Sequence, residues 1–404
     1  MNRTSQTLVQ CEAWSGVFWG LSCPAAAVCT VYMRSRGYSG ADAGFVMAAA
    51  SAVSMALQTP LASFADRAKR VTVAGIFACL CAVIIALAAL MPALSGGGAL
   101  LPIAYAAMLS CAVSCQSISN SLYLLLERRG VAVNYGVGRG TGALGYAVMA
   151  ALLGSAVTVL GSETVPASIA LFAAAELALL LVISHRNTRL GIVGSAGRQS
   201  AQESVGVREF VVRNRRFCAV LIGIVLVYFP HILLANFLIY PVENAGGDSA
   251  VMGRLAAWTA VLELPVMFMF DRLCRRFGAR RLLALAGAAL TVKTAEFSLA
   301  RSIPALFAAG LLQMASFALL IPASVRWASE TVSIADEVKG QSFVTVSMTL
   351  ATFVASLAGG VMYERLGSPA TLGITAIISA VGSVIILTFI FGKKKTAAGA
   401  ENLR

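Results

Sequence analysis

Long apolar segments alternate with short polar gaps along almost the whole chain. Most of these segments exceed the ~20 residues that a helix needs to cross the hydrocarbon of a bilayer. No segment shows the period-two alternation of a membrane barrel, and lipid offers no partners to open backbone groups, so the pattern predicts spanning helices. The expected fold class is an all-α membrane protein with twelve transmembrane helices. The predicted spans are residues 12–33, 43–64, 71–93, 98–125, 135–160, 166–184, 217–241, 250–270, 281–300, 303–325, 338–362 and 369–392.

One long polar segment separates six predicted spans from the other six. It holds seven arginines and only two glutamates, which is typical of a cytoplasmic loop. The predicted organisation is an N-terminal six-helix half at 1–184, a cytoplasmic basic linker at 185–216, a C-terminal six-helix half at 217–392 and a cytoplasmic tail at 393–404.

The composition excludes a soluble globular protein, because 58% of the residues are hydrophobic, 12% are charged and the mean hydropathy is +0.82. The net charge of +13 raises the alternative of a nucleic-acid partner. However, 24 of the 31 basic residues lie in the gaps on the linker's side or in the tails, and only four lie in the opposite gaps. This asymmetry predicts a multi-pass protein of the bacterial cytoplasmic (inner) membrane with both termini in the cytoplasm, and no nucleic-acid partner.

Two prolines occupy matching places in the two predicted halves. Pro24 lies near the middle of the first span and Pro230 near the middle of the seventh, where His231 follows it. Proline interrupts helix hydrogen bonding, and paired interruptions are typical of the central site of a transporter built from repeats. The alternative is that membrane helices simply tolerate proline. The matched positions favour a cavity lining that includes His231.

Charged gaps follow the second and the eighth predicted spans. The first gap contains Asp66, Arg67 and Arg70, and its counterpart contains Asp271 and Arg272. The first gap resembles the Gly-x-x-x-Asp-Arg-x-Gly-Arg-Arg signature of the major facilitator superfamily, although alanine and lysine replace the glycines. The resemblance covers the whole chain and is nearest to the branch with lactose, nucleoside and phenylpropionate permeases. It implies the major facilitator fold, alternating access, and a gating role for these five residues.

The fifth span opens with a glycine-rich block around Arg139 and Tyr146. The block formally matches a dinucleotide fingerprint, but that motif requires a preceding strand in a soluble βαβ unit, so we reject a nucleotide site. Glycines at this spacing favour close helix packing. The block is similar to a lactose permease helix that binds sugar, and this resemblance implies substrate binding by Arg139 and Tyr146. The alternative for Arg139 is a side chain that extends to the cytoplasmic interface.

Polar residues on the fourth span are further candidates for binding substrate. Gln116 and Asn120 lie one turn apart on one helix face, where such groups either contact solute or join helices. We expect solute contact, and we add Trp258 and His231 to the candidates. Lactose permease has an acidic sugar-binding residue on this helix, whereas this chain has Asn120, so the resemblance does not support a galactoside.

Two charged residues are predicted to lie deep in the second half. Counted from the turn between the eighth and ninth spans, Glu263 and Lys293 are about 12 Å and about 18 Å deep, close enough to be partners. They resemble a glutamate and arginine pair of lactose permease. The proton-carrying His and Glu of that family are replaced by Gln313 and Ser316. We therefore predict that Glu263, with Lys293, couples transport to protons; Glu176 and His231 are alternatives, and a structural role is favoured for Glu176.

The function predicted from these residues is the import of a small polar organic solute, such as a sugar, nucleoside or aromatic acid, by proton symport with alternating access. A proton-coupled exporter of sugars or drugs is the alternative, and a membrane-embedded enzyme or a solute sensor is a more distant one. The chain has no motif of a hydrolase or metalloenzyme, so we expect no enzyme, cofactor or metal. The expected partners are the solute, protons and membrane lipid, and the expected state is a monomer.

Overall fold

The computed structural model describes residues 14–67, 73–94, 98–128, 135–188, 207–333 and 336–392. This part of the chain is almost entirely helical and contains no strand, which confirms the predicted all-α membrane fold. In the first half, the first described helix, from Trp14, is followed by these elements: η1 (Cys23–Ala27), α2 (Cys29–Ser35), α3 (Gly40–Arg67), α4 (Val73–Leu90), η2 (Met91–Ala93), α5 (Leu100–Arg128), α6 (Tyr135–Leu160) and α7 (Thr164–Thr188).

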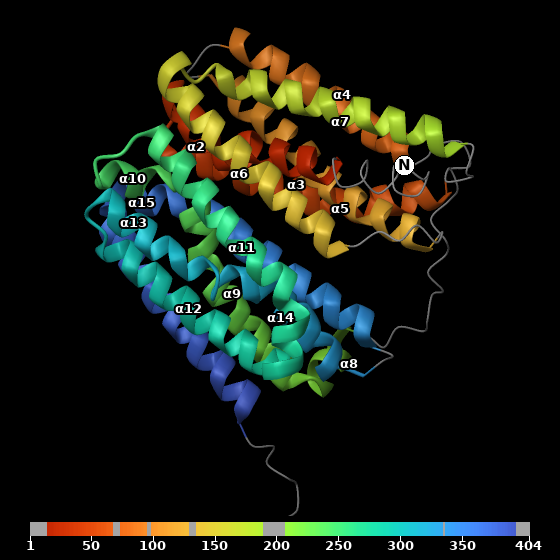
Figure 1. The fold of residues 1–404 in the computed structure, drawn as a ribbon, viewed down its shortest axis with the longest axis vertical. Coiled ribbons are helices and arrows are strands. Elements are labelled where there is room, and N and C mark those ends of the chain that lie inside the picture. The colour runs from red at the N-terminus through yellow and green to blue at the C-terminus, as the bar shows by residue number, and fades with distance from the viewer. Residues whose placement is uncertain are drawn as a thin grey trace, which may run out of the picture.

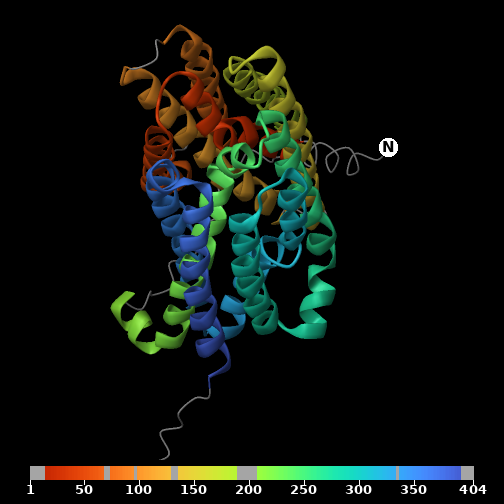
Figure 2. The same cartoon turned by 90° about the vertical axis from the view of Figure 1, so that its left-hand side faces the viewer.

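The second half begins with a short helix inside the predicted linker. The elements are α8 (Val207–Arg213), α9 (Arg215–Asn236), α10 (Ile239–Asn244), α11 (Ser249–Phe277), α12 (Ala279–Leu299), α13 (Ile303–Gly310), η3 (Leu311–Gln313), α14 (Phe317–Thr331) and α15 (Glu337–Phe391). Figure 1 shows the two halves meeting at the end that carries α2 and α10, and Figure 2 shows the same arrangement from the side.

Nine helices in the described ranges are long and apolar enough to cross a membrane, or ten if a bent pair counts as one span. The predicted eleventh and twelfth spans form the single element α15, which is kinked where Gly367 adopts a φ of 73°. The predicted fourth span corresponds to α5, of which Leu100–Cys115 is counted as a shorter apolar helix. The exact number of twelve therefore stays a prediction.

The two matched prolines differ in their effect on the helix. Pro24 lies in the π-helix η1, and the two parts of this span meet at an angle of 43°. Pro230 lies inside α9, which ends at Asn236 before α10 begins. Because a proline lacks the N–H that a helix needs at that position, the irregularity at Pro24 follows from the sequence, whereas α9 continues through Pro230.

The predicted tenth span is not one continuous helix. It is divided into α13 and α14 by the 3₁₀ turn η3 and a non-helical residue, Ser316, whose φ and ψ are −105° and −100°. Gly310, a weak helix former, ends α13 against the Trp258 ring, and the Gln313 side chain in the turn bonds to other helices. The apolar pattern did not reveal this break, because the residues on both sides of it are equally apolar.

Two helix pairs join the halves, α3 with α15 and α6 with α11. Glycines allow both contacts. A Cβ atom added to Gly360 would overlap the carbonyl oxygen of Gly40, and one added to Gly154 would lie 2.8 Å from the Cα atom of Gly253. At these two places the helix backbones touch directly, as is common where small residues pack in membranes.

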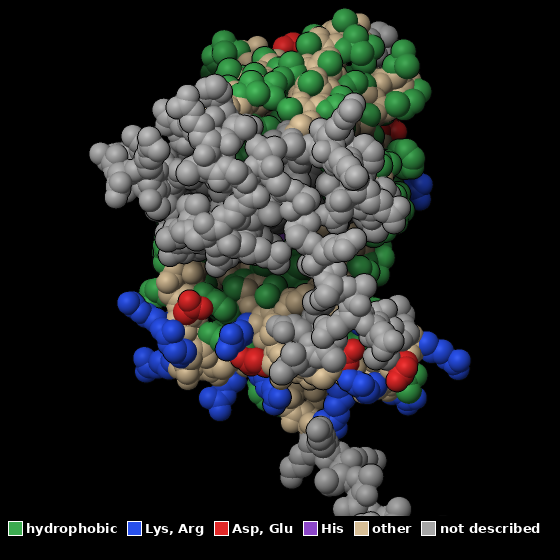
Figure 3. Space-filling view, turned by 90° about the vertical axis from the view of Figure 1, so that its right-hand side faces the viewer, with side chains coloured by type: hydrophobic (Ala, Val, Ile, Leu, Met, Phe, Trp, Pro, Cys, Tyr) green, Lys and Arg blue, Asp and Glu red, His purple; other side chains and the backbone are tan. Residues whose placement is uncertain are grey.

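The helix α8 packs on the second half. Phe210 stacks on Phe343 with ring centroids 5.1 Å apart, and the Arg213 guanidinium donates to the buried carboxylate of Asp336. Exposed arginines follow on α9 and at the turn between α11 and α12, and Figure 3 shows Lys and Arg gathered at this end of the second half. That this end faces the cytoplasm stays a prediction, and residues 189–206 of the linker lie outside the described part of the chain.

Candidate functional site

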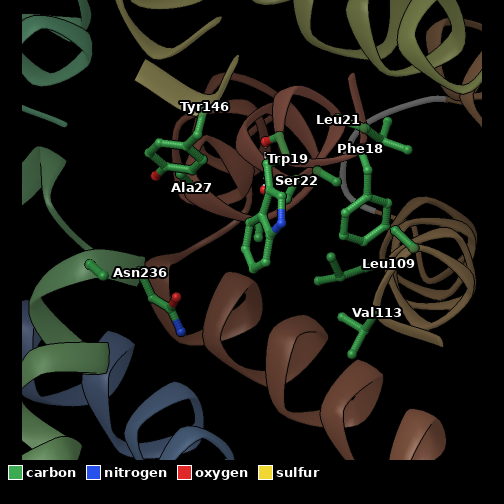
Figure 4. Close-up of a pocket in the computed structure, with 13 residues that line it drawn as sticks. Phe18, Trp19, Leu21, Ser22, Ala27, Leu109, Val113, Tyr146 and Asn236 are labelled. Carbon is green, nitrogen blue, oxygen red and sulfur yellow. Dashed lines mark hydrogen bonds between the residues drawn. The ribbon is translucent and has the colours of Figure 1, made fainter. Parts of the chain in front are cut away.

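A cavity of about 260 Å³ lies between the two halves, beside the break at Pro24 (Figure 4). This volume is just below the ~300–1,000 Å³ that is typical of small-molecule pockets. Four elements and the first helix contribute to its wall, through Phe18, Trp19, Leu21, Ser22, Ala25, Ala26, Ala27, Leu109, Ala112, Val113, Tyr146, Ala235 and Asn236. The cavity has room for a solute of one or two rings.

Three aromatic side chains lie among small aliphatic ones in the lining, and few polar groups accompany them. Phe18 and Trp19 form an edge-to-face pair with centroids 5.7 Å apart, and Tyr146 lies across the cavity from Phe18 (Figure 4). The Ser22 hydroxyl donates to the Trp19 carbonyl at 2.7 Å. The Asn236 amide nitrogen donates to the Ser356 hydroxyl at 3.0 Å, a bond that does not use the amide oxygen. Such a lining suits a flat ring, held by stacking and by a hydrogen bond from the solute to Asn236.

The glycine-rich block of the fifth span makes room for this lining. A Cβ atom at Gly142 would overlap the Trp19 ring, and one at Gly145 would overlap the backbone of Gly16. The first helix and α6 therefore approach closely, with Trp19 and Tyr146 at their junction. Close helix packing was predicted from the glycines. Trp19 was not predicted to line the cavity, because an aromatic residue in an apolar span resembles an ordinary core residue. The available signal was its position shortly before Pro24, where the helix is interrupted.

A buried polar network crosses three elements of the second half. The Lys293 ammonium on α12 donates to the Gln313 amide oxygen in η3, and the Gln313 amide nitrogen donates to Glu263 on α11 at 2.7 Å. Lys293 and Gln313 are buried and Glu263 is half-buried. Gln313 thus lies between Lys293 and Glu263, and the charge of Glu263 acts on Lys293, so their partnership stays a prediction. The break after α13 explains this position, since it turns Gln313 towards both charges.

We expect Gln313→Leu to destabilise the protein, because the buried Lys293 ammonium loses its acceptor. An unsatisfied buried group of this kind costs on the order of 1–3 kcal/mol, or more when it is charged. The measurement is the melting temperature of the purified protein, with Leu311→Met in the same turn as the control. Gln313→Glu restores an acceptor for Lys293 and should lower the melting temperature less than Gln313→Leu does. An unchanged melting temperature for Gln313→Leu would show that this network does not stabilise the protein.

Other predicted site residues lie apart from the cavity. The Trp258 indole donates to the Phe307 carbonyl at 3.2 Å and does not line the cavity. His231 is buried, with its ring stacked on Phe317 at 4.3 Å. Glu176 is fully buried in α7, and neither carboxylate oxygen has a hydrogen-bond partner within the described part of the chain. Its location away from the cavity agrees with a structural role, which stays a prediction.

Several predictions fall on side chains outside the described residues. The helices that carry them are placed, but the side chains of Arg139, Gln116, Asn120, Asp66 and Arg67 are not described, and Arg70 is outside altogether. Asp271 and Arg272 are exposed near the end of α11. Substrate binding by Arg139, Gln116 and Asn120 therefore stays a prediction. The gating role of the two charged gaps also stays a prediction.

Polar contacts close one end of the bundle, the end that carries α2 and α10. Arg34 pairs with Glu243 at 2.9 Å, and Glu364 accepts a hydrogen bond from the Gly40 N–H. Tyr240 stacks on Tyr363 at 4.9 Å.

Asn236 connects this closed end to the cavity, because its carbonyl accepts from the Thr30 hydroxyl at 2.9 Å. Exposed ion pairs contribute at most about 1 kcal/mol each. The direct backbone packing at Gly40 and Gly360 therefore does more than Arg34 and Glu243 to hold this end closed.

Comparison with known proteins identifies transporters. The model of the MFS_1-like family matches residues 27–373. The chain is 26% identical over 380 residues to the maltose permease of Geobacillus stearothermophilus, which covers 92% of this chain and 91% of the permease. It is 30% identical over 187 residues to the MFS-type transporter ppzB of Metarhizium rileyi (strain RCEF 4871), covering 46% and 37% of the two chains.

Solved structures show the same fold. The nucleoside transporter NupG has a TM-score of 0.72 at 16% identity, covering 98% of this chain and 100% of that one. A bacterial homologue of the iron transporter ferroportin, in an inward-facing state, has a TM-score of 0.69 at 14% identity, covering 97% and 100%.

Proposed function

The chain belongs to the MFS_1-like family of major facilitator transporters, and from this premise we propose that it imports a small polar organic solute by proton symport. The solute classes that we consider are sugars, nucleosides and aromatic acids. Like its relatives, the chain is a transporter, and it is not an enzyme. We place it in the bacterial cytoplasmic membrane with both termini in the cytoplasm, as the distribution of basic residues predicts.

The observation that supports symport is the position of the Lys293, Gln313 and Glu263 network beside the substrate cavity. Glu263 lies close enough to Tyr146, a cavity residue, to interact with it electrostatically. Ionisable residues at this depth in a membrane protein are rare and typically serve proton or ion pathways. Glu263 is the proton carrier in this proposal because it is half-buried, whereas Lys293 is enclosed.

Alternating access follows from the closed end. The contacts of Arg34, Gly40 and Gly360 seal the cavity on one side, which we assign to the outside of the cell. The structure then represents the inward-facing conformation, and opening this end requires the pairs α3 with α15 and α6 with α11 to separate. The halves rock about the cavity, so a solute bound there meets each side in turn.

The test is uptake into liposomes that contain the purified protein. A panel of neutral sugars, nucleosides and arenecarboxylates is offered with an imposed proton gradient, acidic outside. We expect at least one class to accumulate, and a protonophore to abolish the accumulation. Accumulation with a sodium gradient alone would contradict proton coupling, and efflux driven by the proton gradient would identify the exporter instead.

A further inference from the structure

Unpaired polar groups gather at the break in the predicted tenth span. Ser316 precedes α14, its hydroxyl is fully buried, and it makes no hydrogen bond with any described residue. His231 on α9 lies against the same helix end, since its ring stacks on Phe317, the first residue of α14, at 4.3 Å. The Nδ1 atom of His231 is also buried without a partner in the described chain, and the residue is only 8% exposed.

Lys293 supplies a cation to the same place. Its ammonium group bonds to Gln313, three residues before Ser316, and its charge acts on His231. One bond to Gln313 uses one of the three ammonium hydrogens. The N-terminus of α14 adds a partial positive charge, because the first N–H groups of a helix have no partner within it.

The charged and titratable groups around Lys293 are few. His231 faces it from α9 and Glu263 acts on it from α11. The described residues that η3, α14 and α15 contribute nearby are amides and hydroxyls, such as Gln313, Ser316 and Ser379. Tyr146 on α6 lies near Glu263, and the side chain of Arg139 on the same helix is not described. Among the described residues, Glu263 is the carboxylate whose charge acts on Lys293, while the Ser316 hydroxyl and the His231 Nδ1 atom have no hydrogen-bond partner.

A carboxylate of a ligand can accept hydrogen bonds from the Lys293 ammonium group and from the unpartnered Ser316 hydroxyl. Resting on the transport function proposed above, we propose that the solute is a small aromatic carboxylate. Its carboxylate is held by Lys293 and Ser316 at the start of α14, beside His231. Its ring lies in the cavity against Trp19 and Tyr146. His231 and the cavity residue Ala235 are one turn apart on the same face of α9, so the two subsites are about 5–6 Å apart along that helix.

This assignment links the solute to the proton. When Glu263 is ionised, its negative charge offsets Lys293 through Gln313; when Glu263 takes up a proton, the charge of Lys293 becomes available to the solute. One proton and one carboxylate add no net charge to the site, so the transport cycle is electroneutral. Because coupling between two ligands is reciprocal, protonation should tighten carboxylate binding.

The binding test uses the full-length purified protein and matched pairs of probes. Phenylacetate and benzoate are compared with phenylacetamide and benzamide, and with uridine and maltose, by thermal stabilisation at pH 6 and pH 8. We expect the acids alone to stabilise the protein, with a dissociation constant that falls by up to about tenfold per pH unit on acidification if one proton binds with each acid. Stabilisation by uridine, maltose or the amides without stabilisation by the acids would overturn the inference and leave the transport proposal intact.

Variants locate the subsite. Ser316→Ala and His231→Asn should each weaken phenylacetate binding several-fold, and Lys293→Met should abolish it if that variant folds. The control is Ser324→Ala, a buried serine on the same helix whose hydroxyl bonds to the Leu320 carbonyl. Unchanged phenylacetate affinity in both Ser316→Ala and His231→Asn would overturn the assignment of the carboxylate to this break. Failure of the transport proposal would appear separately, as acid binding without gradient-driven uptake.

Discussion

Replacement of Glu263 by glutamine is expected to reduce proton-driven accumulation to the level of liposomes without protein, while exchange of solute down its gradient persists. Glutamine cannot carry a proton, but its amide oxygen can still accept the hydrogen bond from Gln313 that Glu263 accepts now. Solute binding and the rocking of the halves therefore remain, and only the coupling is lost. The measurement compares accumulation under an imposed proton gradient with exchange at equal pH.

The matched control is Glu296→Gln, the same chemical change at an exposed acid on α12. It should leave both accumulation and exchange unchanged. Accumulation at the wild-type level by Glu263→Gln would show that another group carries the proton, and Glu176 and His231 would then be the next residues to test.

A valine at Gly360 is expected to slow transport by about 5- to 150-fold. Its side chain would overlap the Gly40 carbonyl oxygen, and overpacking of this kind costs about 1–3 kcal/mol. The penalty applies only when α3 and α15 touch at the closed end, so it disfavours the inward-facing conformation and leaves the outward-facing one unstrained. Uptake rate and melting temperature are measured together, to separate slow cycling from unfolding.

Gly98→Val provides the comparison for Gly360→Val. Gly98 lies near the same end, where Tyr38 donates to its carbonyl, and a Cβ atom there would meet nothing within 4 Å. This variant should transport at the wild-type rate. If Gly360→Val does so as well, the backbone contact at Gly40 is not required for closure.

The sequence predicted the helices well, because their apolar lengths reflect the thickness of a bilayer and not the details of packing. It also predicted the break at Pro24, since proline acts through its own backbone, whereas α9 continues through Pro230. It did not predict the break at Ser316. That interruption depends on contacts with Lys293 and Glu263, which are 20 and 50 residues from Gln313 along the chain.

The cavity residues were also predicted only in part, because contacts between distant segments determine which residues form the wall. Tyr146 was proposed from its resemblance to a known helix, and it lines the cavity, although its role in binding stays a prediction. Asn236 was not proposed, because it becomes part of the wall only where α9 ends and Thr30 and Ser356 meet it. Gln313 was regarded only as the replacement of a lost proton carrier. Its position between two charges depends on three elements at once, which no local pattern records.

The docking of α8 bears on how the protein should be dissected. A fragment of the second half that began at residue 217 would lack Phe210 and Arg213, leaving Phe343 without its stacking partner and the buried Asp336 carboxylate without its cation. A split between residues 189 and 206 keeps both contacts within one fragment. Co-expression of the two halves as separate polypeptides therefore has its best division point before Val207, ten residues earlier than the first residue of the predicted seventh span.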